Sequence, residues 1–332
     1  MDLISFRDLS KEEVEDYFAR AEAMDKQLES GNVEKLEGIV ATMFFEPSTR
    51  TKLSFQSAAE RLGLQIVDFV GETSSLKKGE SFEDTIKTVD GYADIIVLRH
   101  PLEGSARVAA EFAKAPVANG GDGGNQHPSQ TLLDLYTLKK MKGDIGALNV
   151  HLVGDLKHAR TMRSLLYGLA MFGAKVKLVA PAGLEMARDA IADVKEKFGV
   201  EVEETDVIDF KGADVVYVCR IQEERFEDKY EAMSVKKKFT IKPEYLQGVK
   251  EDMIILHPLP KIDEIPPEVD KSKYARYFEQ AKNGIPMRMA IMKKMLSSAQ
   301  QSQCEAKRAK PGTALASHCE KKPKVSKMME GE

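Results

Sequence analysis

The sequence predicts an α/β fold made of two doubly wound parallel-sheet domains. Short apolar runs rich in β-branched residues recur along the chain, and stretches with helical periodicity separate them. Strands that are apolar over nearly their whole length are typical of parallel sheets covered by helices on both faces. The chain of 332 residues is long for a single domain, so we expect two sheets, each in its own domain.

The first domain is expected to span residues 1–131. Its opening strand is predicted at 38–45, and the segment 48–63 then reads as a helix that Gly63 ends. Three further apolar runs predict the remaining strands, at 65–69, 93–101 and 115–121.

The second domain is expected to span residues 132–285. It follows a joint near 131–147, which reads as one long helix and then a polar turn. Four apolar runs predict its strands, at 148–155, 174–181, 214–222 and 252–260. Two long helical stretches lie between them, at 159–172 and 184–198.

The last helix, predicted at 286–302, is expected to pack back on the first domain and complete it. From Gln303 onward the apolar periodicity ends and basic residues outnumber acidic ones. We therefore expect residues 303–332 to form a disordered tail.

Composition excludes several classes of function. The formal net charge is −4, from 49 basic and 53 acidic residues, so nothing global indicates binding to nucleic acid or to a membrane. No apolar run approaches the roughly 20 residues of a spanning helix, and the first residues carry no signal-peptide pattern. We expect a cytoplasmic protein. Its cysteines, Cys219, Cys304 and Cys319, are odd in number and lack zinc-site spacing.

The segment FFEPSTRT, residues 44–51, has the features of an anion site. Pro47 and Ser48 stand where a strand ends and a helix begins. The first turn of a helix has unpaired N–H groups and a partial positive charge, so it binds anions. The hydroxyls and Arg50 add donors suited to phosphate oxygens. Taken alone, the segment is more typical of a serine cap followed by a surface arginine.

Polar side chains also follow the other predicted strands. Ligands of open parallel sheets bind outside the carboxyl ends of the strands, so this recurrence predicts one cleft for a small anionic ligand. Each residue alone has an ordinary structural explanation, such as a surface charge. The residues at these strand ends are Arg99, His100, His127, Gln130, Asp155, Arg160, Arg220, Gln222 and His257.

Several motifs are absent from the sequence. There is no G-x-G-x-x-G after a strand and no Walker loop, which argues against dinucleotides and nucleoside triphosphates. There is no H-E-x-x-H and no G-x-S-x-G, so neither a metal nor an acyl-enzyme is indicated. A site rich in donors without a nucleophile favours direct transfer between two bound substrates.

The chain resembles the catalytic chains of the aspartate carbamoyltransferase family over about residues 1–301. The matching motifs occur in the family's order: FFEPSTRT, LRHPLEG, GDGGNQHPSQTLLDLYT, GDLKHARTMRSL, CRIQEERF, LHPLPKIDEI and YFEQAKNGIPMRMA. The resemblance implies the aspartate/ornithine carbamoyltransferase fold, with a carbamoyl-phosphate domain and an aspartate domain. It implies a homotrimer with shared active sites, no cofactor and no metal in the chemistry, and a place in pyrimidine biosynthesis.

The resemblance also implies roles for positions that contact carbamoyl phosphate. Its phosphate would be bound by Ser48, Thr49, Arg50 and Thr51. Its carbonyl oxygen would be polarised by Thr51, Arg99 and His127. Its amino group would be held by Gln130 and the backbone around Pro258, Leu259 and Pro260.

The two carboxylates of aspartate would be bound by Arg160, Arg220 and Gln222. Ser75 and Lys78, from the loop of a neighbouring subunit, would complete the site, although Ser74 fits the serine role equally well. Aspartate's amine would then attack the carbamoyl carbon, and phosphate would leave. Lys52 replaces the arginine of many family members, and we expect little effect.

Two alternatives remain open at this point. Ornithine carbamoyltransferases share the phosphate site, but typically carry H-C-L-P where this chain has Pro258 in H-P-L-P. A cationic acceptor side chain would also face the positive charges of Arg160, Arg220 and Lys78. The second alternative is a non-catalytic homologue acting as a scaffold. Where the family has regulatory chains, they pair two trimers, and the sequence does not decide whether this chain binds them.

Overall fold

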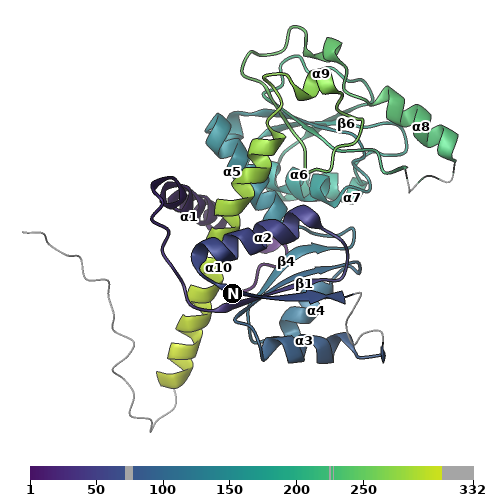
Figure 1. Ribbon diagram of the computed structural model, residues 1–332. Coiled ribbons are helices and arrows are strands. Elements are labelled where there is room, and N and C mark those ends of the chain that lie inside the picture. Colours follow the sequence, from purple (N-terminus) through teal and green to yellow (C-terminus); the bar gives the residue numbers. More distant parts are fainter. Residues whose placement is uncertain (72–77, 224–225, 227, 309–332) are drawn as a thin grey trace, which may run out of the picture.

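The computed structural model of the chain describes residues 1–71, 78–223, 226 and 228–308. Its two wholly parallel sheets confirm the predicted α/β class (Figure 1). The first sheet has the strand order β2-β1-β3-β4, and the second has the order β7-β6-β5-β8-β9. The predicted tail beyond residue 308 lies outside the described residues.

The first sheet consists of strands close to those predicted from sequence. They are β1 (Ile39–Phe44), β2 (Gln65–Val70), β3 (Ile95–His100) and β4 (Val117–Asp122). Helix α2 (Thr49–Leu62) follows β1 and ends at Gly63, whose φ of 80° is left-handed as expected. Helices α3 (Phe82–Asp90) and α4 (Ser105–Phe112) pack against the other face of the sheet through a separate apolar cluster.

The second sheet contains one strand that the sequence pattern did not predict. Strand β7 (Val202–Thr205) is an edge strand of four mostly polar residues, so it lacks the apolar run that marks the others. The other strands are β5 (Asn149–Val153), β6 (Lys175–Val179), β8 (Val215–Val218) and β9 (Ile254–Leu256). Their helices are α6 (Arg160–Phe172), α7 (Arg188–Phe198), α8 (Lys229–Lys238) and α9 (Pro267–Asp270).

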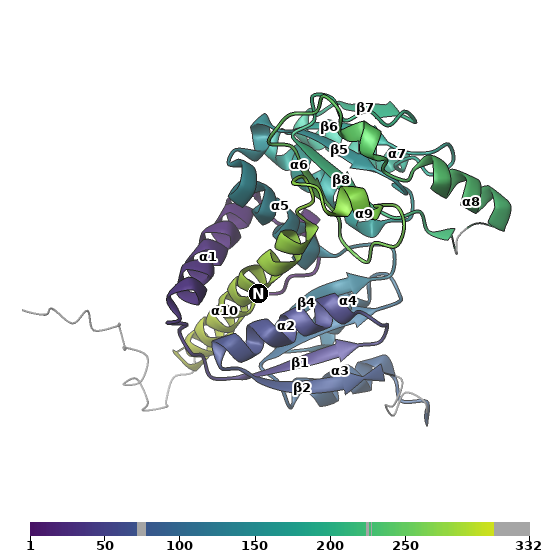
Figure 2. The same ribbon diagram turned by 45° about the horizontal axis from the view of Figure 1, so that its top comes forward.

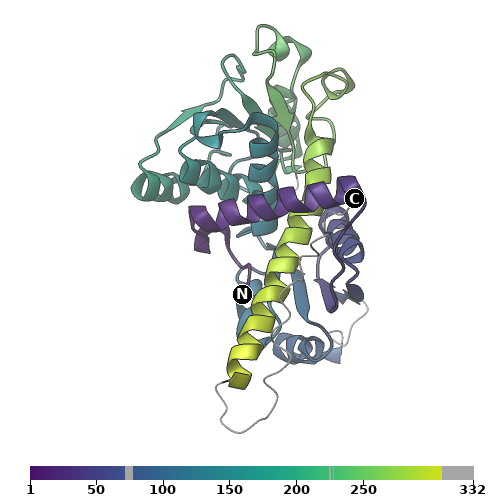
Figure 3. The same ribbon diagram turned by 90° about the vertical axis from the view of Figure 1, so that its left-hand side faces the viewer.

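Three long helices join the two sheets. Helix α1 (Lys11–Ser30) begins with a capping box between Ser10 and Glu13, and α5 (Pro128–Lys142) connects β4 to the second sheet. Helix α10 (Tyr277–Arg308) runs past both sheets and crosses α1 (Figures 1 and 3). One apolar core continues between the sheets, and its members include Phe55, Leu135, Leu165 and Met289.

The bounds of α10 differ from the predicted 286–302. The helix begins nine residues earlier, at Tyr277, so Pro286 lies inside it and does not mark its start. Tyr277 and Gln280 are buried against the second sheet. This packing stabilises the first turns of the helix, which the local sequence did not predict. The helix also continues to Arg308, past the predicted start of disorder at residue 303. Helix α10 packs against α1 and α2 (Figure 2).

No helix within the described ranges is both long enough and apolar enough to cross a membrane.

Candidate active site

A cleft of about 1140 Å³ lies between the two sheets, at the carboxyl ends of their strands. Residues that follow β1, β3, β4, β5, β8 and β9 line it, as the pattern of strand ends predicted. It brings together the following predicted residues: Ser48, Thr49, Arg50, Thr51, Arg99, His127, Gln130, Arg160, Arg220, Gln222, Pro258, Leu259 and Pro260.

The start of α2 forms one wall of the cleft. Ser48 is the N-cap residue by position, but its side chain makes no capping hydrogen bond, contrary to the expected serine cap. Its hydroxyl therefore remains available to a ligand beside the unpaired N–H groups of the first turn. The Arg50 guanidinium is exposed to the cleft and has no carboxylate partner among the described residues. Lys52, on the same helix, instead pairs with Asp68 at 2.7 Å.

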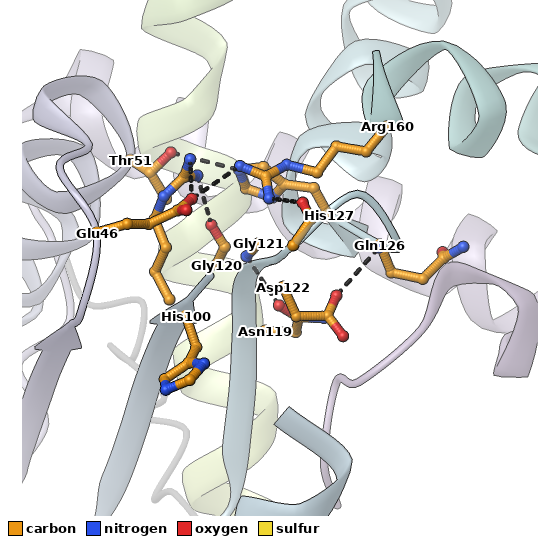
Figure 4. A network of polar contacts seen from close by, with 12 residues as sticks. Glu46, Thr51, His100, Asn119, Gly120, Gly121, Asp122, Gln126, His127 and Arg160 are labelled. Atoms are coloured by element: carbon orange, nitrogen blue, oxygen red, sulfur yellow. Dashed lines mark hydrogen bonds and ion pairs between the residues drawn. The ribbon is translucent and has the colours of Figure 1, made fainter. Parts of the chain in front are cut away.

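Thr51, Arg99 and His127 approach one another from three elements. Thr51 Oγ1 lies 3.3 Å from His127 Nε2, and both residues are buried (Figure 4). Burial and the nearby charges of Arg99 and Arg160 hold the pKa of His127 well below its usual value. The imidazole is therefore neutral at physiological pH, so its Nε2 can donate to a carbonyl oxygen only in the tautomer that carries the proton there.

Glu46 joins the two halves of the cleft. Phe44 of β1 is paired with Arg99 of β3, so Glu46 emerges beside that arginine. Its Oε1 forms an ion pair with Arg99 Nη2 at 2.6 Å and accepts a hydrogen bond from Arg160 Nη2 at 3.0 Å (Figure 4). Burial and the charge of Arg160 lower the pKa of Arg99 to about 10, although Glu46 opposes this shift. The Arg99 guanidinium remains cationic at neutral pH.

Gly121 leaves room for these two guanidiniums at the end of β4. A Cβ at this position would lie 2.9 Å from Arg99 Nη1 and 3.3 Å from Arg160 Cζ. The backbone there also has a φ of 119°, which side-chain-bearing residues rarely adopt. The sequence GG in the predicted strand 115–121 is thus explained by the close approach of two arginines.

The second sheet contributes the groups expected to bind an amino acid. Arg160 is the first residue of α6, and Arg220 and Gln222 follow β8. The buried Asp155 orders this region, because its carboxylate accepts hydrogen bonds from the backbone N–H of His158 at 3.0 Å and of Gln222 at 3.4 Å.

The turn after β9, residues 257–260, lines the cleft. His257 Nε2 lies 2.8 Å from Glu264 Oε1, and His257 Nδ1 accepts a hydrogen bond from Leu259 N at 2.8 Å. Leu259 has a φ of 58°, and the Leu259–Pro260 bond is cis. The His257 side chain therefore supports the turn through both ring nitrogens, and the residue also lines the cleft.

Two predicted positions lie elsewhere. Lys78 is exposed and does not line the cleft of its own chain, and Ser75 is outside the described residues. His100, named among the polar strand ends, was a wrong expectation. Its ring packs 4.8 Å from the ring of Phe45 and 5.1 Å from that of Phe82, away from the cleft. The alternation of side chains along β3 turns His100 to the opposite face from Arg99.

Several ionisable residues that line the cleft or lie directly beneath it were given no role from the sequence, among them Glu46, Asp134 and Arg288. Glu46 was visible within FFEPSTRT, next to the predicted anion site, but its partners come from distant segments. Asp134 is buried on α5, and Arg288 is buried on α10 with its guanidinium 5.0 Å from the Phe55 ring. A charged residue inside an apolar helix was the available signal for both.

The arrangement is suited to binding a small polyanion and polarising a carbonyl. It offers a helix start, five arginines and a neutral histidine. The cysteine that lines it, Cys219, is buried, and burial raises the pKa of its thiol well above the usual value, which disfavours the nucleophilic thiolate. No group of three or more potential metal ligands occurs within the described part of the chain. The fold and this cleft define a transferase-like α/β protein that acts on two anionic ligands.

Sequence models of the carbamoyl-P binding domain and the Asp/Orn binding domain of aspartate/ornithine carbamoyltransferases match residues 1–140 and 147–295. The chain therefore belongs to the aspartate/ornithine carbamoyltransferase family. The aspartate carbamoyltransferase catalytic subunit of Thermococcus kodakarensis is 50% identical over 298 residues, covering 88% of this chain and 95% of that protein. That of Methanopyrus kandleri is 48% identical over 296 residues, covering 88% and 96%.

Solved structures show the same likeness. The catalytic subunit of M. jannaschii aspartate transcarbamoylase has a TM-score of 0.84 and 46% identity, covering 90% of this chain and 99% of that chain. The Trypanosoma cruzi enzyme in complex with carbamoyl aspartate and phosphate has a TM-score of 0.83 and 37% identity, covering 88% and 94%. The predicted resemblance to aspartate carbamoyltransferase catalytic chains is thus confirmed.

Proposed function

We propose that the chain transfers the carbamoyl group of carbamoyl phosphate to the amino group of L-aspartate, yielding N-carbamoyl-L-aspartate and phosphate. The observation that carries this proposal is the single cleft in which the start of α2 faces Arg160, Arg220 and Gln222. One wall suits a phosphate and the other suits carboxylates. The relatives that cover most of this chain are named aspartate carbamoyltransferases, which supports aspartate as the acceptor.

Each half of the cleft has its own ligand in this proposal. Residues 1–131 and the helix 286–302 bind carbamoyl phosphate, and residues 132–285 bind aspartate. Ser48, Thr49, Arg50 and Thr51 hold the phosphate. Gln130 and the carbonyls of the 258–260 turn hold the carbamoyl amino group.

The reaction needs no covalent enzyme intermediate. The aspartate amine attacks the carbamoyl carbon, and the negative charge that develops on the carbonyl oxygen is stabilised by Thr51, Arg99 and His127. The tetrahedral intermediate collapses as the carbon–oxygen bond to phosphate breaks and phosphate takes the electron pair. Phosphate then accepts the proton lost by the amine. Preorganised donors and proximity supply the catalysis.

The cleft of one chain lacks Lys78, so a second copy is proposed to supply it. Lys78 is exposed on the same chain and does not line that chain's cleft. We therefore propose a cytoplasmic homotrimer in which each active site borrows Ser75 and Lys78 from a neighbour. The name catalytic subunit among the relatives is compatible with a larger assembly that includes regulatory chains. The pathway served would be pyrimidine biosynthesis.

The decisive experiment is an assay of the purified chain with carbamoyl phosphate and either aspartate or ornithine. We expect ureido product with aspartate only. Product with ornithine would overturn the acceptor assignment while leaving the phosphate site intact. No product with either acceptor, from a folded trimer measured by light scattering, would favour the scaffold alternative.

A further inference from the structure

A buried polar cluster lies directly beneath the cleft, and no role has been assigned to its central residue. Asp134 on α5 is 1% exposed and accepts hydrogen bonds from two other elements, β8 and α10, and from its own helix. Its Oδ1 accepts from Gln130 Nε2 at 2.9 Å and from Gln280 Nε2 at 2.7 Å. Its Oδ2 accepts from the hydroxyl of Tyr217 at 2.8 Å.

The bond to Gln130 determines which end of that amide faces the cleft. An ionised carboxylate only accepts hydrogen bonds, so Gln130 must turn its NH₂ group toward Asp134. The amide is planar, so its Oε1 is turned away from Asp134, and Gln130 is one of the residues that line the cleft. A carbonyl oxygen in that place can accept a hydrogen bond from a ligand N–H. A methyl group in the same position donates none, so the oxygen would be left unpaired.

The bond to Gln280 extends the same effect to the turn after β9. Gln280 donates to Asp134 through Nε2, so its Oε1 is left to accept, and it accepts from His257 N at 2.9 Å. That N–H begins the 257–260 segment, whose carbonyls are the other proposed acceptors for the carbamoyl amino group. One carboxylate thus orients both sets of acceptors.

We propose that Asp134 is a positioning residue that gives the site its preference for a carbamoyl over an acyl group, by holding Gln130 and Gln280 with their oxygens as acceptors. The proposal rests on the proposed function, because it assumes that Gln130 meets the carbamoyl amino group. Sites built to hydrogen-bond an N–H reject analogues without it by large factors, since the acceptors are then left unpaired.

The charge state of Asp134 adds a readout that a purely structural residue would not show. Burial raises its pKa to about 7, although the hydrogen bonds from Gln280, Tyr217 and Gln130 and the charge of Arg288 oppose the shift. The groups facing it are Tyr217 on β8, Gln280 and Arg288 on α10, and Gln130 on its own helix. A protonated carboxyl can donate to Gln130 Oε1, which would let the Gln130 amide rotate so that its oxygen and nitrogen exchange places.

The test compares kcat/KM for carbamoyl phosphate and acetyl phosphate, with aspartate as acceptor, at about pH 8.5. Acetyl phosphate carries a methyl group in place of the amino group. Asp134→Ala should lower the carbamoyl-to-acetyl ratio at least about tenfold. Asp134→Asn, whose Oδ1 still accepts from both glutamines, should keep it within about threefold. Tyr217→Phe removes the bond to Oδ2 and the long one, 3.5 Å, that the hydroxyl accepts from Gln280 Nε2. It leaves both glutamines bonded to Oδ1 and should leave the ratio unchanged.

A second measurement is made chiefly on the unmodified chain, so its main result does not depend on the folding of a variant. In the unmodified chain the ratio should fall as pH decreases through about 7, and in Asp134→Asn it should not. Titrations shared by the two acyl phosphates cancel in the ratio. An equal fall in kcat/KM for carbamoyl phosphate and acetyl phosphate in Asp134→Ala would overturn the proposal. A ratio that does not change with pH in the unmodified chain would do the same.

Gln130→Ala separates this inference from the proposed function. A fall in the ratio for Gln130→Ala without any fall for Asp134→Ala rejects the positioning role alone. An unchanged ratio for Gln130→Ala rejects the role of Gln130 itself, and with it both proposals for this part of the site.

Discussion

Glu46 and Arg160 are hydrogen-bonded across the cleft, 114 residues apart in sequence, with Oε1 of the first 3.0 Å from Nη2 of the second. Glu46 follows a strand of the first sheet, and Arg160 begins a helix of the second (Figure 4). This bond, together with the one from Glu46 to Arg99, fixes the guanidiniums proposed to meet substrate.

Glu46→Ala is therefore expected to lower kcat/KM for aspartate about 10–100-fold. Hydrogen bonds to charged groups contribute about 1.5–3 kcal/mol, and both arginines would lose theirs. Steady-state kinetics with carbamoyl phosphate saturating measures the effect. Glu83→Ala, which breaks an exposed pair with Lys87, is the matched control and should change little. Unchanged kinetics in Glu46→Ala would show that the arginines hold their places without it.

Arg50→Ala should lower kcat about 10²–10³-fold with the fold retained. The guanidinium lines the cleft and has no protein carboxylate to pair with in the described residues, so its loss removes positive charge from the proposed phosphate site. Lys52→Ala on the same helix removes a charge that pairs with Asp68 outside the cleft, and should have near-normal activity. Near-normal turnover in Arg50→Ala would refute the phosphate assignment.

His127 should remain neutral through the physiological pH range. Its pKa is lowered in the folded chain, chiefly by burial, whereas the unfolded chain has a value near the usual 6.5. The unfolded state thus binds the proton more readily, so this residue's contribution to stability is complete above about pH 6.5 and is lost as pH falls below it. Imidazole ¹⁵N NMR, assigned with His127→Gln, should show a neutral ring down to at least pH 6.5. A midpoint near that pH would contradict the expectation.

Gly284→Ala should destabilise the chain, even though alanine is more favourable than glycine inside a helix by about 1 kcal/mol. A Cβ at Gly284 would overlap Nη1 of the buried Arg288, one turn along α10. Overpacking of this kind costs about 1–3 kcal/mol. Chemical denaturation of Gly284→Ala, Arg288→Met and the double variant measures the coupling, and the double variant should be more stable than Gly284→Ala.

Gly91→Ala is the control for that series, because a Cβ there would meet only Thr88 O at 3.4 Å. Additive effects in the double-variant cycle would mean that the helix relaxes without involving Arg288.

Most elements of the fold could be predicted because their signals are local. The apolar runs of β1, β3 and β8 and the left-handed glycine after α2 are each encoded in a few consecutive residues. Strand β7 and the first turns of α10 were missed, since one is a polar edge and the other is stabilised by burial of Tyr277 and Gln280. Local helix and strand propensities do not reflect sheet-edge position or burial by distant segments, so they predict neither element.

The same division applies to the site. The sequence by itself determined that donors follow the strands and that the segment 48–51 starts a helix, because parallel topology places all such ends at one edge. Only the tertiary structure decided that Glu46 lies between Arg99 and Arg160, that His100 faces away, and that Asp134 meets Gln280 from 146 residues away. Those relationships depend on how the two sheets and α10 pack. The energy of a buried charge depends on its hydrogen-bond and ion-pair partners, and these come from segments that are distant in sequence.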